Sequence, residues 1–135
     1  MTDTELLVLL DRRERCQLAK DEFHHRDHLA VAAAYLYANN FEAALARMRT
    51  SLMRFAAHHG VNGLYHETLT RFWLLKVEQR LDRQQCLCES VRKIQEQLAD
   101  KELPLRFYSK DILNSSAARS TWIEPDLQPV NTIEP

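Results

Sequence analysis

The chain has few of the residues that interrupt helices or form tight turns. It contains two glycines and four prolines in 135 residues, and every proline lies at or beyond Pro104. Hairpins need turn residues between strands, and strands need polar and apolar residues in alternation, yet neither pattern is present. These absences predict an almost entirely helical protein.

The composition also lacks an excess of charge of either sign. Eighteen lysines and arginines face nineteen acidic residues, which gives a net charge of -1. Because no strong field would steer the chain toward nucleic acid or an anionic membrane, we expect neither partner. The longest apolar run, residues 29–38, is much shorter than the roughly 20 residues that cross a bilayer. The N-terminus lacks a basic leader, so the sequence predicts a cytoplasmic protein.

Cysteine is scarce and does not follow the spacing of a disulfide framework. Cys16 stands alone, while Cys86 and Cys88 are separated by one residue. Inside a helix this spacing places two thiols on different faces, which is a poor arrangement for one tetrahedral metal. We therefore expect reduced thiols that serve as small, half-buried apolar side chains.

Apolar residues at helical spacing are what the chain has in abundance. The run from Leu29 to Ala38 is apolar all round and includes five alanines, which is typical of a central, buried helix. Turns are expected at Asn39-Asn40, at Gly60 to Gly63 and at Asp82, which is predicted to cap the helix after it. The predicted helices cover residues 5–18, 25–38, 41–58, 64–81, 83–99 and 109–114, with a further turn at 115–119.

This pattern predicts an all-α fold, a bundle of about five helices around a central apolar helix. Residues 1–120 are long enough for one domain with its own core. Residues 121–135 hold three prolines and are expected to be extended. Trp122, Ile123 and Leu127 could dock the first half of this segment on the bundle; the alternative is a disordered tail.

The six histidines of the chain are predicted to lie at one end of the bundle. Short links make consecutive helices antiparallel, so the second helix starts beside the end of the third and the start of the fourth. Imidazole is the commonest protein metal ligand, and facing helices often supply it. The histidines are His24, His25, His28, His58, His59 and His66.

Their spacing predicts a candidate metal site. His24 and His28 have i, i+4 spacing if the second helix starts early enough to include His24, and His25 with His28 offers an i, i+3 alternative. His66 faces inward at the start of the fourth helix, and Glu67 follows it as a fourth ligand or a candidate general base. Zinc, iron or nickel would suit these donors. The candidate ligands are His24, His28, His66 and Glu67.

A small acidic ligand is the alternative for the same corner. The N-termini of two helices favour an anion there, and Arg26, Thr68 and Arg71 could supplement them. The zinc-protease pattern His-Glu-x-x-His is broken, because Thr70 stands where its second histidine would be. Whether the protein is an enzyme is left open. The candidate ligand-binding residues are Arg26, Tyr65, Thr68 and Thr70.

Each histidine also has a structural interpretation. A histidine at a helix start can cap it, and Asp27 and Glu67 are the acidic residues that a first turn favours. His58 and His59 are cations at the negative end of a helix, and His66 could be a satisfied core group. The alternative function is accordingly a non-catalytic interaction or structural module, such as a homodimer, held by a helical face or by the segment around Trp122.

Two motifs give the chain a likeness to a known group of proteins. Phe23-His24-x-x-x-His28-Leu29 and Tyr65-His66-Glu67-Thr68-x-Thr70 resemble motifs of small bacterial helical proteins that are conserved but have no established activity. Tyr108-Ser109 and the run from Trp122 to Leu127 are similar to the end of the same family. The resemblance covers residues 23–127. It implies a fold, a candidate site and an ordered C-terminal segment, but no reaction.

Overall fold

The computed structural model describes residues 2–14, 24–61 and 65–132. These residues form seven α-helices and one short 3-10 helix, with no strand among them, so the predicted all-α class is confirmed. None of these helices has the length and apolar character needed to cross a membrane. The helices are α1 (Asp3–Glu14), α2 (His25–Ala38), α3 (Phe41–His58), α4 (Glu67–Arg80), α5 (Leu87–Gln97), η3 (Leu103–Arg106), α6 (Lys110–Leu113) and α7 (Ser116–Ser120).

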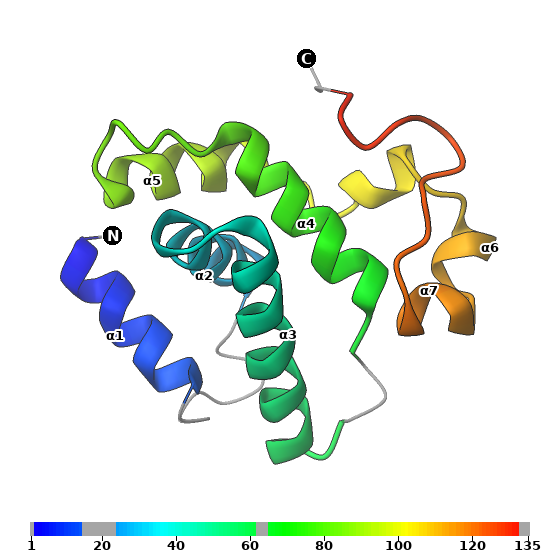
Figure 1. The fold of residues 1–135 in the computed structure, drawn as a ribbon, viewed down its shortest axis with the longest axis horizontal. Helices are drawn as coiled ribbons and strands as arrows, with labels where there is room; N and C mark the ends of the chain where they lie inside the picture. Colours follow the sequence, from blue (N-terminus) through cyan, green and yellow to red (C-terminus); the bar gives the residue numbers. More distant parts are fainter. Residues whose placement is uncertain (1, 15–23, 62–64, 133–135) are drawn as a thin grey trace.

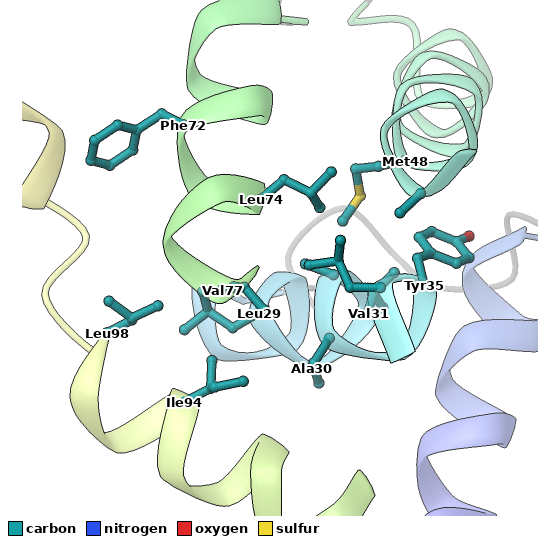
Figure 2. Close-up of a cluster of buried hydrophobic side chains, with 14 of the residues drawn as sticks. Leu29, Ala30, Val31, Tyr35, Met48, Phe72, Leu74, Val77, Ile94 and Leu98 are labelled. Atoms are coloured by element: carbon teal, nitrogen blue, oxygen red, sulfur yellow. The ribbon is translucent and has the colours of Figure 1, made fainter. Parts of the chain in front are cut away.

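Helix α2 lies in the middle of the bundle, with α1, α3, α4 and α5 packed around it (Figure 1). Every residue from Leu29 to Leu36 is at most 7% exposed, and four of these eight are alanines. Because alanine has only one methyl group, the neighbouring helices can pack close to the α2 backbone. Figure 2 shows side chains converging on α2: Met48 of α3, Leu74 and Val77 of α4, Ile94 of α5, and Leu98, which follows α5 as its C-cap.

Two predicted helix starts differ from the observed ones by three or more residues. Helix α4 begins at Glu67, because the His66 side chain caps it by accepting a hydrogen bond from the Leu69 amide. Helix α5 begins only at Leu87, because Asp82 does not cap it. The Asp82 carboxylate instead accepts from the Gln84 amide two residues on, at 2.9 Å, which holds a turn before the helix. Residues 15–18 and 64 of the predicted helices, and residues 62–63 of the predicted turn, lie outside the described residues.

The C-terminal segment, residues 121–132, is hydrogen-bonded to the rest of the chain through Thr68 of α4. The Thr68 hydroxyl donates to the carbonyl of Thr121 at 2.8 Å and accepts from the amide of Ile123 at 3.2 Å. The Leu127 amide donates to the carbonyl of Phe107 at 2.9 Å. The segment therefore runs past the start of α4 and the turn after η3, next to α7 (Figure 1).

Docking continues beyond the first half of this segment. Gln79 of α4 donates to the carbonyl of Val130 at 3.1 Å, and Lys76 donates to the carbonyl of Thr132 at 2.8 Å. The Lys76 side chain is fully buried, and its ammonium lies 4.0 Å from the centre of the Phe107 ring. A buried cation needs such partners, so the segment supplies polar contacts as well as cover.

Tyr108 provides the first testable contact of this segment. Its hydroxyl donates to the carbonyl of Ile123 at 2.6 Å, and burial raises its pKa, so the hydroxyl remains a donor. Tyr108→Phe is expected to lower the free energy of unfolding by about 1–2 kcal/mol, because the carbonyl loses its partner. Tyr37→Phe is the matched control, since that hydroxyl makes an exposed bond of 3.2 Å to Gln85. Urea unfolding measures both variants, and an equal loss of unfolding free energy in the two would contradict the stabilising role of the Tyr108 hydrogen bond.

Candidate functional site

A cavity of about 420 Å³ lies between α2, α3 and α4. Its size falls within the ~300–1,000 Å³ that is usual for small-molecule sites. Aliphatic and aromatic side chains form most of its wall, and these come from all three helices. They include Leu29 and Ala32 of α2, Leu52 and Phe55 of α3, and Leu69 and Trp73 of α4. The polar lining residues are His25, His28, Tyr65, His66 and Thr70.

Three of the six histidines reach this cavity. His25 and His28 come from the start of α2, and His66 comes from the residue that caps α4. Antiparallel packing accounts for their proximity, as the short links between helices predicted. The others do not line the cavity: His24 and His58 are exposed, and His59 packs its ring 4.4 Å from that of Phe55.

The imidazole of His66 uses both of its nitrogens within the protein. Nδ1 accepts from the Leu69 amide at 3.1 Å, so Nε2 carries the hydrogen and donates to the carbonyl of Leu113 at 2.8 Å. The ring therefore caps α4 and ties it to the end of α6. A metal could bind His66 only by displacing one of these hydrogen bonds. His66 therefore has a structural role in the wall of the cavity.

His25 is held in a similar way. Its Nε2 lies 2.9 Å from the carbonyl of Leu98, and because a carbonyl can only accept, this nitrogen is the donor. The ring packs against that of Trp73 in a T-shaped arrangement, with centroids 4.6 Å apart. His25 thus joins α2 to the end of α5 and positions the Trp73 indole in the cavity wall.

Glu67 belongs to a network of three side chains beside the cavity. The Arg49 guanidinium of α3 binds both carboxylate oxygens, at 2.8 and 2.7 Å, and the Tyr65 hydroxyl donates to Oε1 at 2.6 Å. These bonds hold the pKa of Glu67 below its usual value, and burial together with the carboxylate raises the pKa of Tyr65 to about 12. A carboxylate with a lowered pKa and three donors is a poor base, so Glu67 does not have the surroundings of the predicted general base.

The predicted ligand-binding residues divide into two groups. Tyr65 and Thr70 line the cavity. Arg26 does not: it is exposed, and its carbonyl accepts from Gln95 of α5. Thr68 is also outside the cavity, because its hydroxyl is bonded to the C-terminal segment.

The predicted metal ligands are not brought together. The exposed His24 precedes α2, and its amide donates to the carboxylate of Asp27 at 3.0 Å, so it lies outside the helix and loses the i, i+4 relation to His28. His66 and Glu67 are occupied as described above. Within residues 2–14, 24–61 and 65–132, no group of three or more histidine, cysteine or acidic side chains could hold a metal ion. The structure does not bring the four residues together, and the metal site stays a prediction.

Arg49 is the functional neighbour that the sequence did not reveal. It lies on the side of α3 where α4 begins, and it binds Glu67 there. A charge on a polar face reveals no partner 18 residues further along the chain. Nothing in the spacing distinguishes this arginine from the other charged residues of α3 and α4.

Comparisons with known proteins give no relative for this chain. No protein-family model matches it, and searches of curated proteins and of solved structures gave no match either. The resemblance to small bacterial helical proteins stays a prediction. Function has to be inferred from the cavity and its chemistry.

Proposed function

We propose that the protein binds a small, largely apolar organic molecule in the cavity between α2, α3 and α4. The observation that supports this function is the cavity itself. It combines about 420 Å³ of space and apolar walls with a few polar groups where α2 and α4 begin. Apolar walls provide most of the binding free energy in such sites, and a few polar groups fix the orientation of the ligand.

Four of the five polar lining groups already commit their hydrogens to the protein: His25, Tyr65, His66 and Thr70. Tyr65 donates to Glu67, Thr70 donates to the carbonyl of His66, and the two histidine Nε2 atoms donate to backbone carbonyls. The hydroxyl oxygens of Tyr65 and Thr70, and Nδ1 of His25, retain lone pairs that can accept. These groups therefore suit a ligand that donates hydrogen bonds.

This capacity favours a neutral ligand with a hydroxyl or amide N–H group over the small acid that the sequence suggested. At Tyr65, Thr70 and His25 an anion would face acceptors, and Arg49 is already bound to Glu67 through two bonds. An unsatisfied carboxylate buried among acceptors carries a large desolvation cost. We expect the hydroxyl end of the ligand to lie toward Tyr65 and Thr70, and its apolar part to lie between Phe55 and Trp73.

A pair of probes with one skeleton tests the chemical class. The chain has two tryptophans, so Trp122→Phe leaves Trp73 in the cavity wall as the sole indole reporter. Titration with 3-phenylpropan-1-ol should change Trp73 fluorescence, and 3-phenylpropanoate should bind at least about tenfold more weakly, which is about 1.4 kcal/mol. Equal or tighter binding of the acid would contradict the proposed ligand class, and no response to either probe would contradict the binding function.

One observation favours an interaction module as the second candidate. Leu7 and Val8 of α1 are 63% and 53% exposed, next to the fully buried Leu6. Adjacent exposed apolar side chains on a helix can serve a contact between two copies of the chain. Light scattering tests this contact. A wild-type dimer that becomes monomeric in Leu7→Asp would support the interaction function, and a wild-type monomer at all accessible concentrations would contradict it. The Trp122 segment is bonded to its own chain, which argues against it as the contact.

A further inference from the structure

Cys86 and Cys88 place their sulfur atoms 3.2 Å apart, which is hydrogen-bonding distance for two thiols. The sequence suggested thiols on different faces of a helix, and this expectation was wrong. Cys86 is the residue before α5, with an extended backbone at φ −65° and ψ 152°, while Cys88 lies in the first turn. Because α5 starts late, Cys86 lies outside the helix, and its extended backbone lets the two sulfur atoms lie side by side.

The turn that carries Cys86 is fixed on both sides. The Cys86 carbonyl accepts from the Ser90 amide at 3.2 Å, and the Ser90 hydroxyl donates to the carbonyl of Asp82 at 2.9 Å. Arg83 donates to the carbonyl of Leu36 at 3.0 Å, which ties the same turn to the end of α2. The backbone around the pair is therefore held by bonds to two helices, independently of the thiols.

The Cys86 thiol is accessible and has no capping role. Cys86 is exposed, and its side chain makes no capping hydrogen bond to the backbone amides of the first turn of α5. A serine or aspartate in this position would normally cap the helix. The sulfur instead lies against Cys88 on the surface, where a dissolved molecule can reach it.

We propose that Cys86 and Cys88 form a reversible dithiol–disulfide site that reacts with low-molecular-weight disulfides. The thiolate of Cys86 attacks one sulfur of the disulfide RSSR, forms a Cys86–SR mixed disulfide and expels RS⁻. The thiolate of Cys88 then attacks Sγ of Cys86, forms the Cys86–Cys88 bond and expels a second RS⁻. The two thiol protons pass to the released RS⁻ groups, so the dithiol loses two electrons and RSSR becomes two RSH.

The geometry permits the intrachain bond. Residues two apart cannot separate their Cα atoms by more than about 7 Å, and disulfides span ~4.4–6.8 Å between Cα atoms. The sulfurs must approach from 3.2 Å to the bonding distance of about 2.05 Å, which side-chain rotation at the exposed residue can supply. The pair lies at the end of α2 opposite to His25 and His28, so this site and the proposed ligand cavity can be tested separately.

The test uses the full-length chain with Cys16→Ser, which leaves only these two thiols. The folded protein is incubated with glutathione disulfide, free thiols are blocked with a maleimide, and the intact mass is measured. We expect both thiols to escape the maleimide, a mass lower by two hydrogens, no lasting glutathione adduct, and full reversal by excess reduced glutathione. The Cys16→Ser, Cys88→Ser variant should instead retain glutathione on Cys86, because no second thiol resolves the mixed disulfide.

Three results would overturn the proposal. A stable glutathione adduct on the two-thiol protein would show that Cys88 does not attack Cys86. Two maleimide-labelled thiols after exposure to the disulfide would show that Cys86 does not react. If both thiols react in the urea-unfolded chain but not in the folded chain, the folded turn hinders formation of the disulfide. Because none of these readouts uses the cavity, they leave the proposed ligand-binding function untouched.

Discussion

Truncation after Ser120 is expected to lower the free energy of unfolding by about 4 kcal/mol, more than any substitution considered for this chain. The deleted segment carries the partners of Thr68, Tyr108 and the Phe107 carbonyl. Each lost hydrogen bond removes about 1 kcal/mol, and the cover of the buried Phe107 and Tyr108 rings is lost as well. Since small domains have only ~5–15 kcal/mol of stability, the loss should be visible as a much earlier urea transition.

Rescue in trans provides the control for this truncation. A synthetic peptide of residues 121–135 should bind the truncated chain and shift its urea midpoint upward as the peptide concentration rises. The same peptide with Ile123→Pro should not rescue, because proline lacks the amide that donates to Thr68. An unchanged urea midpoint after truncation would mean that the segment adds little to the fold.

Glu67→Ala is expected to lower the free energy of unfolding by about 2 kcal/mol. The change removes the acceptor of Arg49 and Tyr65 and leaves a guanidinium without its partner between α3 and α4. Removal of one partner from a fully buried pair costs ~3–5 kcal/mol, but the Arg49 side chain is 39% exposed, which reduces the effect. Glu42→Ala is the matched control, because its side chain is 75% exposed and its ion pair with Arg71 spans 3.9 Å. That control should change stability by less than about 0.5 kcal/mol.

The same carboxylate should make stability depend on pH in a defined direction. Arg49 lowers the pKa of Glu67 in the folded chain, whereas an unfolded glutamate titrates near ~4.3. A lowered acid pKa contributes stability that is fully present above this value and is lost as the pH falls through the folded pKa. The stability difference between wild type and Glu67→Gln should therefore be constant above about pH 5 and shrink below about pH 4. A difference that does not change with pH would contradict the ion pair.

The central helix could be predicted from the sequence because its pattern is unambiguous. An apolar run with no polar face leaves burial as the only stable placement, and α2 has the bounds that were expected, His25–Ala38. Gly60, the expected terminator of α3, has a φ of 71°, the left-handed conformation that glycine adopts most readily. The gathering of His25, His28 and His66 followed from short links alone, because antiparallel topology decides which helix ends meet.

The roles of these histidines could not be predicted, because their partners are distant in the chain. His25 binds a carbonyl 73 residues away, and His66 binds one 47 residues away. Spacing tells which helix face a side chain occupies, but it does not tell which backbone carbonyl covers that face. The same limit hid the Arg49–Glu67 pair. At Cys86, a shift of four residues in the start of α5 was enough to reverse the expected relation to Cys88.

The cavity between α2, α3 and α4 is proposed to bind a neutral, largely apolar molecule. The most direct test compares two alanine-to-phenylalanine variants, one that fills the cavity and one on the surface. Ala32 is 2% exposed and lines the cavity, whereas Ala46 of α3 is exposed and does not. In the Trp122→Phe background, Ala32→Phe should weaken binding of 3-phenylpropan-1-ol at least about tenfold, and Ala46→Phe should leave it unchanged. Equal binding by both variants, with the helical fold of each intact, would contradict the account.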